Sequence, residues 1–116
     1  MLIRINAEST SPLFEQVAAA VRTELASGNL APCDRLPPAK EIAAALDINV
    51  HTVLRAYQQL RDEGLIDLRR GRGAVVTAAA GPLAALRADV ASLVARAATL
   101  GLSPAALAAL VKESAS

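Results

Sequence analysis

A chain of 116 residues, 53% hydrophobic and only 2% aromatic, has the length of one small domain or of a small domain with a short appendage, and its core must consist of Ala, Leu, Val and Ile. A single cysteine excludes an internal disulfide, and one cysteine with one histidine argues against a zinc site or another metal centre. The net charge of +1 is unevenly distributed, because residues 35–78 carry seven Lys or Arg against five Asp or Glu.

Two helices are predicted in the first 46 residues. Ser11 and Pro12 have the pattern of an N-cap and a first helical residue, since the missing N–H of proline costs nothing there, and Gly28 is expected to end this helix. Residues 29–38 contain three prolines and predict a loop. A second helix is expected over residues 39–46. Its inward face is predicted to be Ile42, Ala43 and Leu46.

A third helix and a hairpin follow. Asn49 is a favourable N-cap for a helix over residues 50–63, and Gly64 is expected to end it. Two short apolar runs, residues 66–68 and 74–77, flank the basic turn R-R-G-R-G and predict a β-hairpin. Two helices joined by a turn and followed by a basic hairpin are the layout of a winged helix-turn-helix, a scaffold that binds DNA.

The third helix has one apolar and one polar face at about 100° per residue. The predicted core face is Val53, Ala56, Tyr57 and Leu60. The opposite side carries His51, Arg55 and Gln58, with Thr52 on its flank. An imidazole, a guanidinium and an amide are groups that contact base edges or phosphates, and the first turn of a recognition helix is the part that enters the major groove. A solvated face without a DNA role is the alternative; the basic turn beside the helix favours DNA.

The basic turn predicts a second contact. Glycine lets a backbone approach phosphate closely, and arginine is favoured in a narrow minor groove, so Arg70, Gly71 and Arg72 are candidates; a basic but inactive hairpin tip is the alternative. Lys40 could bind a phosphate or pair with nearby acids. Tyr57 is interpreted as structural, and residues 61–63 as a solvated helix end.

The last third of the chain predicts an αα-hairpin. Residues 78–81 are expected to be a linker, Pro82 opens a fourth helix, Gly101 ends it, and Ser103 caps a short fifth helix that begins at Pro104. Apolar residues recur at steps of three and four, which indicates a helix-packing seam buried in a homodimer. Packing of this hairpin against the rest of its own chain is the alternative. The seam consists of Leu83, Leu86, Val90, Leu93, Ala97, Leu100, Leu107 and Leu110.

Residues 13–77 resemble the GntR-type bacterial transcription regulators, through the motifs L-F-E-Q-V, S-G-N-L, R-L-P-P-A-K-E-I-A and R-R-G-R-G. The segment N-V-H-T-V-L-R-A-Y-Q-Q-L-R-D-E-G-L-I is similar to the YtrA subfamily in particular, whose tail is a small dimerisation element. The resemblance implies DNA contacts at Lys40, His51, Thr52, Arg55, Arg70, Gly71 and Arg72. The chain departs from the family pattern in having Cys33 and Asp47 in place of glycine, Pro38 in place of a capping serine, and Val50 in place of proline or arginine.

We therefore expect a mainly α protein with a small β-hairpin wing: a winged helix-turn-helix head over residues 1–78 and a two-helix dimerisation hairpin over residues 82–116. The expected function is that of a homodimeric repressor on an inverted-repeat operator, cytoplasmic and associated with the nucleoid, without a cofactor. A winged helix that binds protein instead of DNA is the alternative. Some relatives carry an aminotransferase-like domain, for which this chain has no room, so we expect no enzyme. The sequence indicates no particular small-molecule effector.

Overall fold

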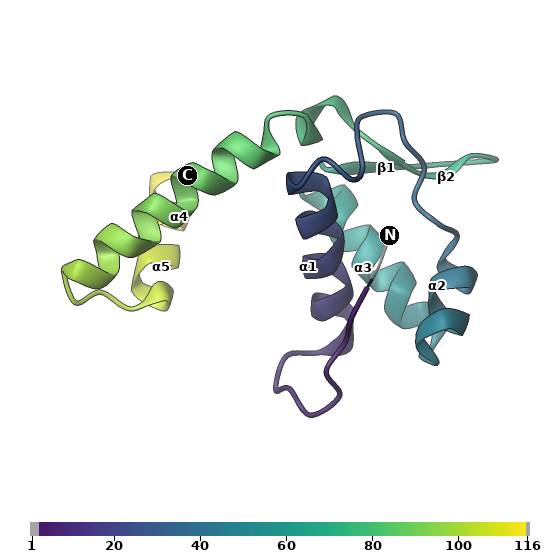
Figure 1. The fold of residues 1–116 in the computed structure, drawn as a ribbon, viewed down its shortest axis with the longest axis horizontal. Helices are drawn as coiled ribbons and strands as arrows, with labels where there is room; N and C mark the ends of the chain where they lie inside the picture. Colours follow the sequence, from purple (N-terminus) through teal and green to yellow (C-terminus); the bar gives the residue numbers. More distant parts are fainter. Residues whose placement is uncertain (1–2, 116) are drawn as a thin grey trace. The chain divides into compact units, whose positions relative to one another are not determined.

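The computed structural model describes residues 3–115 and divides the chain into two compact units that meet at Ala84 and Ala85 (Figure 1). The first unit is called the head below, and the second the tail. No helix within the described residues is long and apolar enough to cross a membrane. Each unit has a simple architecture that follows from its sequence pattern.

The head is a winged helix-turn-helix, as the sequence predicts. It contains α1 (Leu13–Ala26), α2 (Ala39–Leu46) and α3 (Val50–Asp62), followed by β1 (Ile66–Arg69) and β2 (Gly73–Val76). The two strands pair antiparallel, with Ile66 opposite Val76 and Arg69 opposite Gly73. Helix α3 packs against α1, α2 and β1, so it is the element that holds the head together (Figure 1).

The core of the head lies on the faces that the periodicity predicts. All four residues of the predicted core face of α3 are buried, and Ile42 and Ala43 of α2 are buried beside them, whereas Leu46 is only half-buried. Its largest fully buried side chains are Val17, Val21, Val53, Leu60 and Ile66. Because these are branched aliphatic residues with few rotamers, they pack the helices closely, and Tyr57 is the one buried aromatic side chain among the described residues.

The start of α1 differs from the prediction. Pro12, not Ser11, is the N-cap, because proline restricts φ but leaves ψ free, and Pro12 has an extended ψ of 147°. Ser11 therefore does not cap the helix. The Gln16 side chain organises this end instead: its Oε1 accepts from the Asn6 N–H at 2.7 Å, and its Nε2 donates to the Ser11 carbonyl at 3.0 Å. Gly28 ends the helix with a φ of +83°, as predicted.

The loop between α1 and α2 is more ordered than its three prolines suggest. The Cys33 and Leu36 N–H groups donate to the Val76 and Ala74 carbonyls, each at 2.9 Å, and Arg35 forms a β-bridge with Val75. The expected loop thus extends the edge of the hairpin at β2. This pairing brings Arg35 to the wing.

Two residues at positions where the family resemblance implies glycine adopt left-handed backbone conformations. Cys33 has a φ of +76° and Asp47 a φ of +54°, and no other non-glycine residue among those described has a positive φ. Asp tolerates this region better than most residues, whereas Cys has no such advantage. The family's glycine is the residue that both positions favour physically.

The tail is an αα-hairpin of α4 (Leu83–Thr99) and α5 (Pro104–Ser114). Gly101 has a φ of +82° between them, and the Ser103 side chain accepts from the Ala106 N–H at 3.1 Å, so the predicted stop and cap are confirmed. The expected linker is instead a 3-10 turn, η1 (Ala78–Ala80), because Ala80 is buried in the head.

The predicted seam residues of the tail fall into two groups. Leu83 packs against the core of the head, and Ala97 is only 6% exposed. Most of the other apolar side chains of α4 and α5 remain strongly exposed within one chain. The most exposed in the two helices are Leu86, Val90, Leu93, Val94, Leu110 and Val111; Leu100 and Leu102 of the connection are exposed too, and Leu107 is half-buried.

Candidate nucleic-acid interface

The polar face of α3 is directed away from the core. His51, Arg55 and Gln58 are exposed and Thr52 is half-buried, on the side opposite the buried face. The Asn49 side chain accepts from the His51 N–H at 2.8 Å, which confirms the predicted N-cap and fixes the first turn of the helix. The polar side chains of α3 are thus carried on a rigid element.

The wing presents free positive charge at its tip. Gly71 and Gly73 have φ values of +80° and +72°, and the Arg72 N–H donates to the Arg69 carbonyl at 3.1 Å, which closes the turn. Arg69 is paired with Asp67 at 3.3 Å. Arg70 and Arg72 are exposed and form no ion pair with any residue that the structure describes, so their charge is available to a ligand.

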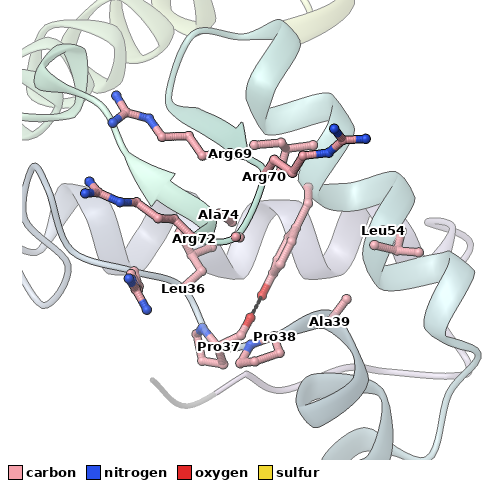
Figure 2. Close-up of a pocket in the computed structure, with 14 residues that line it drawn as sticks. Leu36, Pro37, Pro38, Ala39, Leu54, Arg69, Arg70, Arg72 and Ala74 are labelled. Carbon is pink, nitrogen blue, oxygen red and sulfur yellow. Dashed lines mark hydrogen bonds between the residues drawn. The ribbon is translucent and has the colours of Figure 1, made fainter.

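A groove of about 800 Å³, the wing groove, separates the hairpin from α2 and α3. It is lined by residues 35–39, residues 68–74, and Leu54 and Tyr57 of α3. Figure 2 shows Arg69, Arg70 and Arg72 on the hairpin side and Leu54 across from them on α3. The groove therefore combines four arginines, one of them Arg35, with an apolar floor.

Arg35 is a candidate that sequence reasoning missed. Arg35 precedes Arg69, the first arginine of the wing turn, by 34 residues in the chain. Only its β-bridge to Val75 places it beside the wing arginines. The only available sequence signal is a basic residue directly before the L-P-P motif. Its guanidinium adds positive charge to the groove just before the start of α2.

Tyr57 connects the floor of the wing groove to the start of α2. Its hydroxyl donates to the Pro37 carbonyl at 2.6 Å, the bond drawn as a dashed line in Figure 2. The residue is 3% exposed. Burial, and secondarily the Glu41 carboxylate, raise the pKa of Tyr57 to about 12. Tyr57 is therefore structural, as interpreted, and its hydrogen bond holds the segment that leads into α2, whose N-cap residue Pro38 forms no side-chain cap bond.

A second depression, the α1–α3 hollow, has a volume of about 400 Å³. Its walls include His51, Thr52 and Arg55 of α3 and Phe14 of α1. The Arg55 guanidinium carbon lies 3.8 Å from the centroid of the Phe14 ring. Three of the predicted DNA contacts thus meet in this hollow.

The predicted contact residues are therefore not one cluster. Arg70, Gly71 and Arg72 line the wing groove, and His51, Thr52 and Arg55 line the α1–α3 hollow. Gln58 is exposed on α3, and Lys40 is exposed in the first turn of α2; neither lines these depressions. Lys40 forms no ion pair within the described chain, so of its two alternatives the pairing with nearby acids is not observed.

Residues 61–63 are all exposed, as interpreted, but Glu63 also forms contacts that the sequence does not predict. Its carboxylate accepts from Arg22 Nε at 2.7 Å and from Arg22 Nη2 at 2.6 Å, and also from Gln59 Nε2 at 3.2 Å. The bond from Arg22 is the main cause of the lowered pKa of Glu63. This bidentate pair fastens the end of α3 to α1, whereas Arg61 and Asp62 are exposed as predicted.

The winged helix with a basic wing places the chain among helix-turn-helix regulatory proteins. Residues 13–76 match the family described as bacterial regulatory proteins, gntR family, and the chain belongs to this family. Within the family the chain is YtrA-like, since it is 34% identical over 76 residues to the HTH-type transcriptional repressor YtrA of Bacillus subtilis. The matched segment covers 66% of this chain and 58% of that protein. The chain thus covers less than two thirds of that relative's length.

Solved structures agree with this assignment. The GntR-family transcription factor YtrA from Sulfolobus acidocaldarius is 35% identical, with a TM-score of 0.64 over 82% of this chain and 99% of that one. The DNA-binding domain of AraR in complex with operator ORE1 shares the fold, with a TM-score of 0.57 over 66% of this chain and 94% of that one at 22% identity. The family and these relatives are described as regulatory proteins, a repressor and a transcription factor, which agrees with the expectation of a regulator instead of an enzyme.

Proposed function

We propose that this protein is a sequence-specific DNA-binding transcriptional regulator that acts as a homodimeric repressor on an inverted-repeat operator. The observation that carries the proposal is the exposed polar face of α3 beside a groove with four arginines. A helix with this face fits the width of the major groove, and unpaired arginines on a glycine turn fit phosphate or a narrow minor groove.

The two depressions suggest how a duplex would lie. With the first turn of α3 in the major groove, the wing would reach the adjacent minor groove, and one sugar–phosphate strand would cross the wing groove between them. Arginines at its rim would bind phosphates, while the exposed Leu54 and Leu68 side chains would contact sugars or a thymine methyl group. Repression would follow from occlusion of the promoter.

The names of relatives support this function. YtrA and NagR of Bacillus subtilis, the latter 33% identical over 75 residues, are both called HTH-type transcriptional repressors. The AraR DNA-binding domain has been solved with several operators, and it shares this fold. A protein of this kind would act in the cytoplasm, at the nucleoid.

The wing is tested with a duplex selected from a random-sequence pool by the wild-type protein. Replacing both Arg70 and Arg72 by Ala should weaken binding at least about tenfold. The slope of the logarithm of the binding constant against the logarithm of the salt concentration should decrease in magnitude by about one per lost phosphate contact. Arg61→Ala is the control for loss of an exposed arginine outside the wing groove; it removes one positive charge, whereas the wing variant removes two. Equal affinity of the wing variant and the control would contradict the proposed interface.

The homodimer is supported by the apolar surface of the tail. Leu86 and Val90 of α4 are 58% and 49% exposed, and Leu110 and Val111 of α5 are 50% and 54% exposed. An apolar hollow of about 370 Å³ also opens between the two helices. An apolar surface of this kind is costly in water and is normally covered by another surface, here a second copy of the tail.

Sedimentation equilibrium tests the dimer. Leu93→Asp places a charge in the proposed interface and should shift the wild-type dimer to a monomer. Leu68→Asp is the matched control, because Leu68 of the head is 40% exposed and Leu93 is 42% exposed. A wild-type monomer at micromolar concentration would refute the dimer.

A further inference from the structure

Arg55 differs from the wing arginines in being held by an aromatic ring. Its guanidinium carbon lies 3.8 Å from the centroid of the Phe14 ring, although the two residues are 41 positions apart in the chain. Phe14 belongs to the first turns of α1 and is half-buried, with its ring packed against the core of the head. The ring therefore has a fixed position.

The stacking leaves the hydrogen-bonding capacity of Arg55 unused. A guanidinium that stacks on a ring uses its planar face, and its N–H donors lie in the plane, at the edges. Within the described residues, Arg55 forms no ion pair. His51 and Thr52 line the same hollow, so the in-plane donors are grouped with an imidazole and a hydroxyl.

We infer that Phe14 is a positioning residue for DNA binding: it holds the Arg55 side chain in the conformation that contacts the DNA. The ring has no donor or acceptor of its own and acts through Arg55. A long arginine side chain loses rotamer freedom when it binds, and a side chain that is already ordered loses less. This inference rests on the proposed function, since it assigns Arg55 to the DNA interface.

Two substitutions at Phe14 distinguish the contribution of the aromatic ring face from the contribution of a large apolar side chain. Phe14→Leu keeps a large apolar side chain but removes the ring, and Phe14→Tyr keeps the ring face. Measured by fluorescence anisotropy on the selected duplex, Phe14→Leu should weaken binding about two- to fivefold, the range of an exposed cation–π contact, and Phe14→Tyr should bind like wild type.

A double-mutant cycle distinguishes positioning from a general structural role. Arg55→Ala removes the group on which Phe14 acts, so adding Phe14→Leu to Arg55→Ala should cause no further loss of affinity. A loss of folded protein would act in both backgrounds alike. Thermal unfolding of each variant shows that binding is measured on folded protein.

The stack itself is measured in the free protein. In proton NMR, the Arg55 side-chain protons above the ring face should be shifted upfield by the ring current in wild type and in Phe14→Tyr, and this shift should vanish in Phe14→Leu. Wild-type protons without the shift would overturn the inference even if a variant failed to fold.

The binding outcomes separate this inference from the proposed function. Specific binding by wild type, with a loss from Phe14→Leu that disappears in the Arg55→Ala background, supports it. Specific binding by wild type with unchanged affinity in Phe14→Leu, or with the same loss in both backgrounds, overturns the inference alone. Failure of the wild-type protein to enrich or bind any duplex overturns the proposed function, and the inference with it.

Discussion

The hydrogen bond between Tyr57 and Pro37 gives a prediction that can be worked through in detail. Tyr57→Phe removes the hydroxyl that donates to the Pro37 carbonyl at 2.6 Å and leaves the packed ring in place. A neutral hydrogen bond of this kind contributes about 1 kcal/mol to stability. The substitution should therefore lower the free energy of unfolding at neutral pH by about 1 kcal/mol and loosen the segment that carries Arg35.

The same residue predicts a decline of stability in alkaline solution. The pKa of Tyr57 is raised from 10.0 to about 12 in the folded state, first by burial and then by Glu41. Between these values the folded protein binds more protons than the unfolded chain, so the contribution of the neutral hydroxyl is complete below pH 10 and is lost as the pH rises toward 12. A difference of this size corresponds to at most about 2–3 kcal/mol.

The assay is direct because the chain has one tyrosine and no tryptophan. Phenolate absorbance of the native protein should titrate near pH 12, and that of the denatured protein near pH 10. Urea unfolding of wild type and Tyr57→Phe at several pH values should show their difference in stability shrinking above pH 10 and reversing sign toward pH 12, because the loss of up to about 2–3 kcal/mol on ionisation exceeds the hydrogen bond's contribution of about 1 kcal/mol. Other alkaline effects cancel in the comparison. A native tyrosine that titrates with the denatured one would refute the reasoning.

Two further predictions concern strain and an ion pair. Cys33→Gly should stabilise the head by about 1 kcal/mol in thermal unfolding, because it removes the strain of a cysteine in the left-handed backbone region. Ala31→Gly is the control, at a loop position without a positive φ, and should not stabilise the head. Equal effects of the two substitutions would exclude strain relief. Glu63→Gln should cost about 0.5–1 kcal/mol at neutral pH, since it breaks the partly exposed pair with Arg22. Because the ion pair lowers the pKa of Glu63, its contribution to stability is present above the pKa of Glu63 in the unfolded chain and is lost as the pH falls through the pKa in the folded protein. The stability of Glu63→Gln should therefore fall less in acid than that of wild type, and an equal fall would contradict the assigned role of the pair.

Periodic elements could be predicted from the sequence because their information is local. The observed bounds of α2 equal the predicted ones at both ends, and the observed buried face of α3 equals the predicted core face at each position. The period of a helix alone determines which of its residues face the core. The N-cap at Asn49 and the stops at Gly28 and Gly64 follow from the chemistry of single residues.

Contacts between distant segments could not be predicted in this way. The Arg22–Glu63 pair and the Phe14–Arg55 stack each join α1 to α3 across 41 positions, and no periodicity relates such residues. Arg35 reaches the wing only because its loop pairs with β2, a pairing that has no alternating pattern in the sequence. At Ser11 the error was local: the preference of proline for the first helical position does not determine its ψ.

The most direct test of the central claim is fluorescence anisotropy of the purified protein with the duplex selected from a random-sequence pool. A duplex of the same composition and shuffled sequence serves as the control, and both are measured at two salt concentrations. The proposed function predicts tight binding to the selected duplex that exceeds binding to the shuffled one and survives moderate salt. Weak binding that is equal on both duplexes and is lost with salt would contradict a sequence-specific DNA-binding regulator.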